Sequence, residues 1–257
     1  MPPDYFDRYP TIAFERDDTG VLVMRLHSDG GPVIYSHQHH SDWSRAFREV
    51  AMDRDNRVVV FTGSGDAFCN AFGPQRAITR PCDWDHIYSE GKQMLRDLLE
   101  IPVPVIGAVN GPATIHAELP LLSDITLASE TAVFQDAPHI GFATVPGDGV
   151  HVFWLDWLGT NRGRYFLMTG QELSADEAQR LGVVNEILPP EELMPRALEL
   201  AHQLAGLPDL TLRYTRILLT QRLKRLLDEG IGHGLALEGL AALEMIIPRA
   251  QPAGDAQ

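Results

Sequence analysis

The sequence of 257 residues contains little cysteine, which limits the fold and the sites that it can form. Cys69 and Cys82 are its only cysteines, and neither lies in a CxxC or other metal-binding spacing. Two thiols do not make a disulfide framework in a chain of this length. We therefore expect a protein of a reducing compartment, the cytoplasm, that holds no metal.

Positive charge and long hydrophobic runs are also scarce. Lys and Arg number 21 against 35 Asp and Glu, a net charge of −14, which argues against nucleic acid or an anionic membrane as a partner. No segment approaches the roughly 18 consecutive apolar residues that span a bilayer. The beginning of the chain, "MPPDYFDRYP", lacks the basic and apolar regions of a signal peptide.

Short strands alternate with helices in the first 150 residues. Residues 11–16 and 21–27 alternate apolar and polar side chains around "RDDTG", which predicts a β-hairpin. The apolar run "RVVVFTG" at 57–63 is typical of a buried parallel strand. Further strands are expected at 103–109, in "DITLASE" and in "AVFQD", and helices at 36–53, 85–100 and 117–122. This alternation indicates an α/β fold with right-handed crossovers.

From about residue 150 the pattern is almost entirely helical. "LSADEAQRLG" contains a capping box, Ser174 with Glu177, and ends at Gly182. "PPEELMPRALELAHQLAGLP", "DLTLRYTRILLTQRLKRLLDEG" and "GHGLALEGLAALEM" each indicate a helix, and the tail "PRAQPAGDAQ" is expected to fray. The second helix carries a basic stripe that we expect to be solvated, with a contact surface as the alternative: Arg213, Arg216, Arg222, Lys224 and Arg225.

Several stretches carry a resemblance to a known family. They are "VVVFTGSGDAFCNAF", "IPVPVIGAVNGPA", "SDITLASETAVFQ", "VPGDGV" and "GRYFLMTGQELSADEAQRLGVVNEILPPEELMPRALELAHQLA", in order along residues 12–245. The pattern resembles the crotonase (enoyl-CoA hydratase/isomerase) superfamily. The resemblance implies a β-β-α spiral core over residues 1–190. It also implies a helical C-terminal region over 191–257 that completes the active site and joins subunits into a homotrimer or a dimer of trimers.

The hydratase residues of that superfamily are altered here. In "VNGPATIHAELP", His116 stands where the family has a glycine that supplies an oxyanion-hole amide. Glu118 is the retained first glutamate of a hydratase if the turn is one residue shorter, and this register stays open. Counting back from Pro146 and Gly147, the second glutamate is replaced by His139.

These departures are similar to those of the 6-oxocamphor hydrolase branch, which are β-diketone hydrolases. The matching stretches are "NGPATIHAELP", "FQDAPHIGFATVPGDGVHVFW", "LGTNRGRYFLMTGQEL" and "GLALEGLAALE". The resemblance implies catalytic roles for His40, His116, His139, Asp148 and Glu238. It implies cofactor-free cleavage of a C–C bond in a cyclic or bicyclic 1,3-diketone, a retro-Claisen reaction that gives a keto acid.

The residues themselves suit that chemistry. His139 and Asp148 are separated by a loop rich in glycine, so their side chains can meet, with His139 as general base and Asp148 as its orienting carboxylate. The alternative is a structural histidine and an acid at a helix N-terminus. Glu238, among Leu, Ala and Gly, would hold water or protonate carbon; otherwise it is an ordinary exposed acid.

His116 is the candidate donor to an oxyanion, and a buried histidine bonded to a carbonyl is the alternative. The resemblance adds the backbone amide of Phe72 as a further donor and His40 as a second carbonyl donor. We expect His37 and His39 to lie on the surface, although the cluster "SHQHH" allows a transition-metal site as a weaker alternative.

Two other functions stay open. An enoyl-CoA hydratase or isomerase would need to recognise the phosphates of coenzyme A, and thermal stabilisation by coenzyme A would reveal it. A binding protein without catalysis would have no need of three histidines and two acids at these positions.

Overall fold

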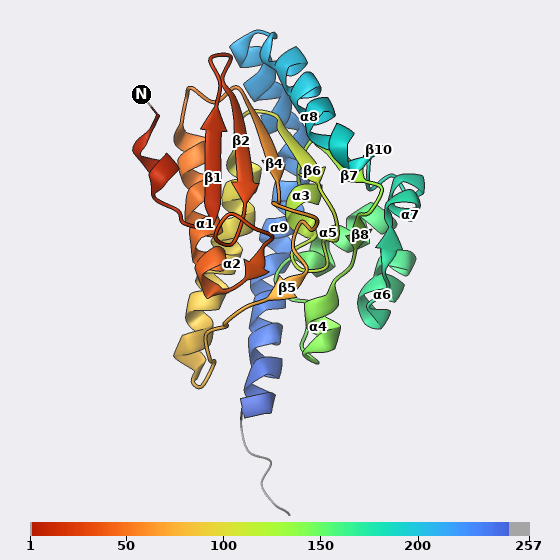
Figure 1. The fold of residues 1–257 in the computed structure, drawn as a ribbon. Helices are drawn as coiled ribbons and strands as arrows, with labels where there is room; N and C mark the ends of the chain where they lie inside the picture. The colour runs from red at the N-terminus through yellow and green to blue at the C-terminus, as the bar shows by residue number, and fades with distance from the viewer. Residues whose placement is uncertain (1, 247–257) are drawn as a thin grey trace, which may run out of the picture.

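Six strands form the central sheet of the protein. A computed structural model describes residues 2–246. The sheet has the order β1-β2-β4-β6-β7-β10 (Figure 1), and only β1 and β2 are antiparallel, as the predicted hairpin requires. Its strands are β1 Ile12–Arg16, β2 Val21–Leu26, β4 Val58–Thr62, β6 Val105–Val109, β7 Ile125–Ser129 and β10 Glu186–Leu188. These parallel strands and their crossovers confirm the α/β prediction.

Two small sheets lie beside the central one. The parallel pair consists of β3 Ile34–Tyr35 and β5 Ala71–Phe72, and the antiparallel pair of β8 Val133–Phe134 and β9 Leu173–Ser174. One half of the predicted capping box forms, because the Ser174 hydroxyl accepts a hydrogen bond from the Glu177 amide at 3.2 Å, whereas the Glu177 carboxylate pairs with Arg162 and Arg180.

Helices cover both faces of the central sheet (Figure 1). They are α1 His37–Met52, α2 Pro81–Glu100, α3 Glu118–Leu121, α4 Ala137–Gly141, α5 Val150–Leu158, α6 Thr160–Thr169, α7 Ala175–Arg180, α8 Pro190–Ala205 and α9 Asp209–Ile246, with a 3-10 turn at Asp4–Asp7. Within residues 2–246, no helix has the length and hydropathy needed to cross a bilayer. The tail expected to fray lies outside the described residues.

Strand β4 shows why the sheet needs a helical layer on each face. All five of its residues are buried, and successive side chains point to opposite faces. Val58 and Val60 pack with α8, whereas Val59 and Phe61 join the larger core that includes α1 and α2. The carboxyl ends of β4 and β6 meet at one edge, where parallel sheets place their ligand sites.

Helix α9 is continuous, where the sequence suggested two helices. Glycines such as Gly230 and Gly234 weaken an isolated helix. Here they lie where a neighbour comes too close for a side chain: a Cβ on Gly230 would meet Val152 at 2.6 Å, and one on Gly234 would meet the carbonyl oxygen of Gly147 at 2.3 Å. Tertiary packing therefore holds the helix together across these positions.

The prediction of a solvated basic stripe on this helix was wrong for Arg213 and Arg216, which are 3% and 1% exposed. Arg216 donates through Nη1 to Asp124 at 2.5 Å and through Nε to the carbonyl of Ile101 at 2.7 Å. Its Nη2 donates to the carbonyl of Leu98, so one guanidinium closes the C-terminal end of α2 and joins it to α9. Arg222 does lie on the exposed side, paired with Asp156.

We expect Arg216→Met to lower the free energy of unfolding by about 3 kcal/mol, because it removes the cation that pairs with Asp124 and the donor to two backbone carbonyls. Urea denaturation followed by circular dichroism would measure this. Arg222→Ala is the matched control and should change the free energy by less than about 1 kcal/mol, since its ion pair is exposed. Equal effects of the two variants would contradict the assignment.

Candidate active site

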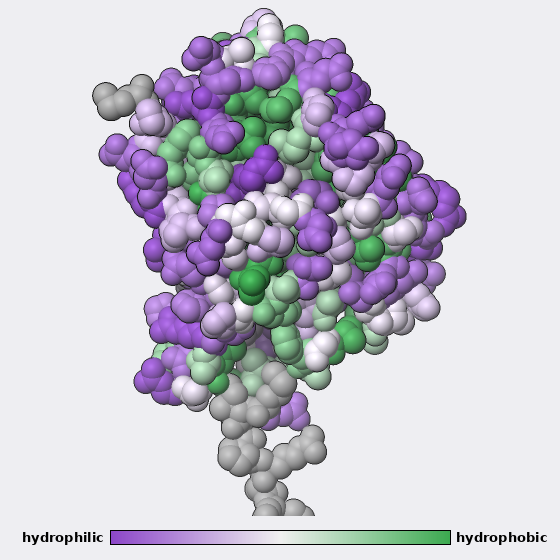
Figure 2. All heavy atoms as spheres, in the orientation of Figure 1, coloured by the Kyte–Doolittle hydropathy of each residue, from purple (hydrophilic) through white to green (hydrophobic). Residues whose placement is uncertain are grey.

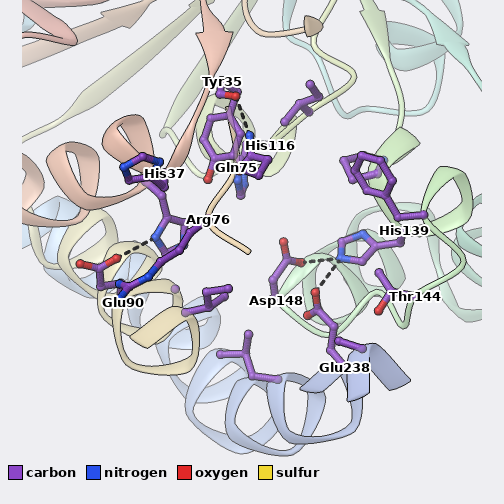
Figure 3. Close-up of a pocket in the computed structure, with 18 of the residues that line it drawn as sticks. Tyr35, His37, Gln75, Arg76, Glu90, His116, His139, Thr144, Asp148 and Glu238 are labelled. Carbon is purple, nitrogen blue, oxygen red and sulfur yellow. Dashed lines mark hydrogen bonds and ion pairs between the residues drawn. The ribbon is translucent and has the colours of Figure 1, made fainter. Parts of the chain in front are cut away.

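A cavity of about 460 Å³ opens where α1, α2, α9 and the loops after β5, β6 and β8 converge (Figure 3). All five predicted catalytic residues line it: His40, His116, His139, Asp148 and Glu238. They come from segments spread over about two hundred positions of the chain, so the fold brings together what the sequence keeps apart.

His139 is held between three carboxylates. Its Nδ1 bonds to Oδ1 of Asp136 at 2.6 Å, within the short helix α4 and the residue before it. Its Nε2 faces Oδ1 of Asp148 and Oε1 of Glu238, each at 3.6 Å (Figure 3). The carboxylate that fixes the ring at Nδ1 is therefore Asp136, where the sequence suggested Asp148.

This arrangement changes the proton affinity of the cluster. Burial opposes a charged ring, but Asp148, Asp136 and Glu238 outweigh it and raise the pKa of His139 to about 11. Burial, reinforced by Asp148 and Asp136, raises the pKa of Glu238 to about 7 in spite of the neighbouring imidazole. Near neutral pH the cluster therefore gains or loses a proton at Glu238 first.

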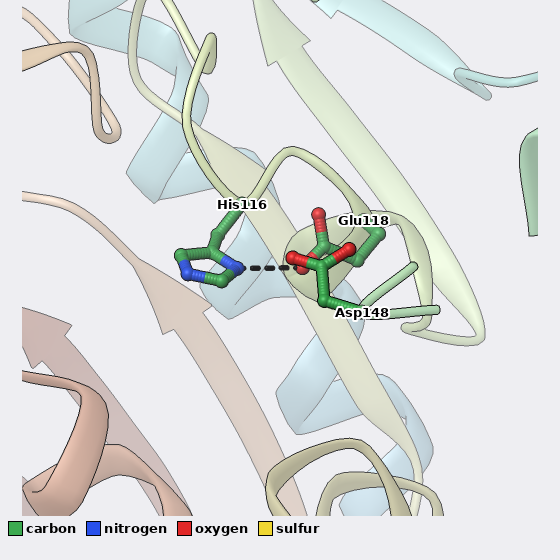
Figure 4. Close-up of side chains that lie close together, drawn as sticks. All are labelled: His116, Glu118 and Asp148. Atoms are coloured by element: carbon green, nitrogen blue, oxygen red, sulfur yellow. Dashed lines mark hydrogen bonds and ion pairs between the residues drawn. The ribbon is translucent and has the colours of Figure 1, made fainter. Parts of the chain in front are cut away.

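His116 adopts a backbone conformation that favours glycine, with φ at +52°. Its Nδ1 bonds to Oε1 of the buried Glu118 at 2.8 Å, and Asp148 lies beside this pair (Figure 4). Burial lowers the pKa of His116, but Glu118 and Asp148 outweigh burial and raise it above its ordinary value. The left-handed backbone costs about 1–2 kcal/mol in a residue with a side chain, which the bond to Glu118 helps to offset.

His116, Glu118 and Asp148 each offer a possible metal-ligand atom within 4.8 Å of the others. The sequence predicted no metal, and the charges of the trio are already matched in part by the bond from His116 Nδ1 to Glu118. The absence of a metal from the reaction stays a prediction.

His40 and His39 occupy opposite environments. His40 lines the cavity and its Nδ1 bonds to Oε2 of Glu90 on α2 at 3.2 Å. His39, expected on the surface, is 5% exposed and forms a capping box with Ser36 at the start of α1. Adjacent side chains on a helix point in different directions, so the ring of His40 faces the cavity while that of His39 caps the helix. His37 is exposed, as expected.

Aromatic rings form the wall and the rim of the cavity. The Tyr35 ring is buried and meets the His116 ring edge-on at 4.7 Å between centroids. The rings of Phe72 and Phe142 pack at 5.1 Å between centroids, and both side chains are exposed. Figure 2 shows one face of the molecule, on which hydrophobic side chains reach the surface between hydrophilic ones. The predicted role of the Phe72 amide as an oxyanion donor is not tested by this placement.

Close packing of α9 brings Glu238 to the site. A Cβ on Gly147 would lie 2.2 Å from the carbonyl oxygen of Gly234 and 2.8 Å from the Cβ of Glu238. Only glycine at both positions lets the Asp148 loop approach the helix this closely. Glu238 is 8% exposed and its Oε2 has no hydrogen-bond partner in the described part of the chain.

Sequence reasoning missed three residues that hold the histidines. Glu90 supports His40, and it lies 50 positions away with no local signal. Asp136 precedes His139 by three positions, a spacing that places two side chains on the same face of a helix, and this signal was available. Tyr35 covers His116 from a short strand that no pattern indicated.

Comparisons with known proteins agree with this architecture. The family model described as enoyl-CoA hydratase/isomerase matches residues 17–233. The chain belongs to this family. A solved β-diketone hydrolase from the cyanobacterium Anabaena sp. PCC 7120, bound to (S)-3-oxocyclohexyl acetic acid, is 50% identical, with a TM-score of 0.92 over 95% of this chain and 98% of that one.

Other relatives carry acyl-CoA names. A putative enoyl-CoA hydratase/isomerase of Bacillus subtilis is 31% identical over 78% of this chain and 76% of its own length. A probable peroxisomal enoyl-CoA hydratase of Arabidopsis thaliana is 28% identical over 88% and 83%. The family and its fold are therefore secure, and the site must decide between the two chemistries.

Asp136→Asn should lower the pKa of His139 by about 1–3, because it removes one of the three carboxylates that stabilise the imidazolium. The raised pKa stabilises the fold fully below the unfolded value of about 6.5, and this contribution is lost as the pH rises toward 11. NMR titration of labelled histidine would measure the pKa. Asp42→Asn, a buried acid bonded to Thr11, is the control. An unchanged His139 titration in Asp136→Asn would contradict the assigned bond.

Proposed function

We propose that this protein hydrolyses a C–C bond of a cyclic or bicyclic 1,3-diketone and releases a keto acid. The observation that carries the proposal is the set of three histidines around one cavity, each bonded at Nδ1 to its own carboxylate: His40 to Glu90, His116 to Glu118 and His139 to Asp136. This leaves each Nε2 for the reaction. The likeness to the Anabaena hydrolase supports the choice of reaction.

Water activation is assigned to the His139 cluster. The ring is protonated near neutral pH, so it becomes a base only when a neighbour takes its proton. Glu238 is placed to take this proton, because burial raises its pKa to about 7 and its Oε1 lies 3.6 Å from Nε2. The transfer is uphill, since the pKa of His139 is about 11. The exchange leaves a neutral imidazole beside a carboxylic acid, and His139 then removes a proton from water as the water adds to the substrate carbonyl.

The remaining steps follow from the same groups. The oxyanion formed by water addition accepts a hydrogen bond from His116, whose pKa is raised so that its ring can donate. When the C–C bond breaks, its electrons pass to the second carbonyl and form an enolate, which His40 and the Phe72 amide stabilise. Glu238 delivers its proton to the carbon of that enolate, and no oxidant, reductant or cofactor takes part.

The alternative is an enoyl-CoA hydratase or isomerase, which the names of the curated relatives favour. In the family that this chain resembles, hydration needs two glutamates that face the substrate. Here His139 stands at the second position, and Glu118 is buried and bonded to His116. The geometry therefore favours the diketone. The cytoplasmic location stays a prediction, since the Arabidopsis relative is named peroxisomal.

The decisive assay uses a non-enolisable bicyclic 1,3-diketone with chromatographic detection of the keto acid, with EDTA present. Wild type should turn it over, and His139→Ala should lose about 10²–10⁴-fold in kcat because general acid–base catalysis is worth this much. His233→Ala, an exposed histidine on α9, is the control and should retain full activity. Hydration of crotonyl-CoA without diketone cleavage, or thermal stabilisation by coenzyme A, would refute the proposal.

We also propose that the chain forms a homotrimer or a dimer of trimers. Supporting this, α9 carries exposed apolar side chains at helical spacing: Leu210, Tyr214, Ile217 and Leu218. Sedimentation equilibrium should give three or six times the chain mass of 28.5 kDa. Leu218→Lys should shift the mass toward the monomer, and a wild-type monomer at micromolar concentration would contradict the proposal.

A further inference from the structure

The site directs its polar groups at oxygen atoms and at water. His40 and His116 each present Nε2 to the cavity, because a carboxylate occupies Nδ1. Polar residues such as Gln75, Arg76 and Thr144 also line the cavity, and the rest of the lining includes apolar side chains: Ile78, Met94, Ile115, Val150 and Leu235. Such side chains neither donate nor accept hydrogen bonds, so they make the same contact with a carbon or a nitrogen atom that joins two carbonyls.

A cyclic imide resembles a cyclic 1,3-diketone at this point. It contains the sequence O=C–N–C=O in place of O=C–C–C=O, so in both compounds a single ring atom separates the two carbonyl carbons. When water adds and the bond to the central atom breaks, the negative charge moves in both cases to the oxygen of the second carbonyl. The two oxygen-binding positions proposed for the diketone would therefore serve the imide.

We propose that this site also hydrolyses neutral, N-substituted cyclic imides to half-amides. The inference rests on the proposed function, since it uses the same base, the same oxyanion donors and the same acid. N-substitution matters because an unsubstituted imide can lose its N–H proton, and the resulting anion resists attack by water in the same way as an enolised diketone does.

The reaction balances with water as its one co-reactant. His139 takes a proton from water while the oxygen of that water bonds to one carbonyl carbon. The tetrahedral oxyanion collapses, the C–N bond breaks and its electron pair passes to the remaining carbonyl as an imidate. Nitrogen takes the proton held by Glu238, which leaves a carboxylic acid and a secondary amide on one chain.

The two reactions differ in the protonation of the leaving group. An enolate must be protonated on carbon, which is slow and needs an acid placed against that atom. An imidate is protonated on nitrogen, which solvent water can also do quickly. Glu238 lines the cavity, and its carboxyl group is the acid that we assign to this step. Loss of this acid should therefore harm diketone cleavage more than imide hydrolysis.

The test compares a bicyclic N-methyl imide with a bicyclic 2,2-dialkyl 1,3-diketone of the same ring size on wild type, His139→Ala, Glu238→Gln and His233→Ala. Products are measured by ¹H NMR or chromatography against buffer alone. Wild type should accelerate imide hydrolysis at least about 10²-fold over buffer, the lower end of general acid–base catalysis. His139→Ala should abolish both activities, His233→Ala neither, and Glu238→Gln should reduce diketone cleavage by the larger factor.

Each other result overturns the inference in a recognisable way. Diketone cleavage with the imide left at the buffer rate would show that the site discriminates the central atom, while the proposed function stands. Imide hydrolysis that survives in His139→Ala would place the activity outside this site. If neither substrate is cleaved by wild type, the proposed function fails as well and the imide inference falls with it.

Discussion

The site depends on one repeated interaction, a carboxylate bonded to Nδ1 of three histidines that line the cavity: His40, His116 and His139. An imidazole has two nitrogens, and the partner of one decides what the other can do. Glu90, Glu118 and Asp136 bond to Nδ1 of the three rings, so Nε2 is the nitrogen left for other partners, and in His139 it faces Asp148 and Glu238. These bonds orient the rings before a substrate binds, and such prior orientation underlies electrostatic catalysis.

This arrangement requires the C-terminal helix to lie very close to the rest of the fold. Gly147 and Gly234 permit the approach, and the guanidinium of Arg216 anchors the same helix to the end of α2 some distance along it. A helix held at one point could rotate or slide, whereas one held at both a glycine contact and a buried cation is fixed. The position of Glu238 against His139 is a consequence of these two contacts.

Much of the fold could be predicted because its signals are local. Apolar runs and N-cap residues depend on neighbouring positions, and strand β4 and the Ser174 cap of α7 follow from them. The five residues predicted to be catalytic came from the resemblance, and all five line one cavity. The partners of the histidines could not be predicted in the same way, since Glu90 is distant in sequence from His40. The buried Arg216 was misassigned for a related reason. An amphipathic pattern shows which face of the helix carries a side chain, but it does not show that Asp124, distant in sequence, lies opposite that face.

The family relationship explains why the two chemistries are so close. The resemblance implies that a hydratase of this family places two carboxylates around an acyl group, and that His139 stands at one of those positions in this chain. The exchange turns a pair of acids into an imidazole surrounded by acids, with Asp148 and Glu238 both 3.6 Å from Nε2. Moving one proton from His139 to Glu238 would create both a base and an acid in this cluster without changing its net charge. Hydrolysis that must first remove a proton from water and then return one to carbon needs both a neutral imidazole and a protonated carboxyl group.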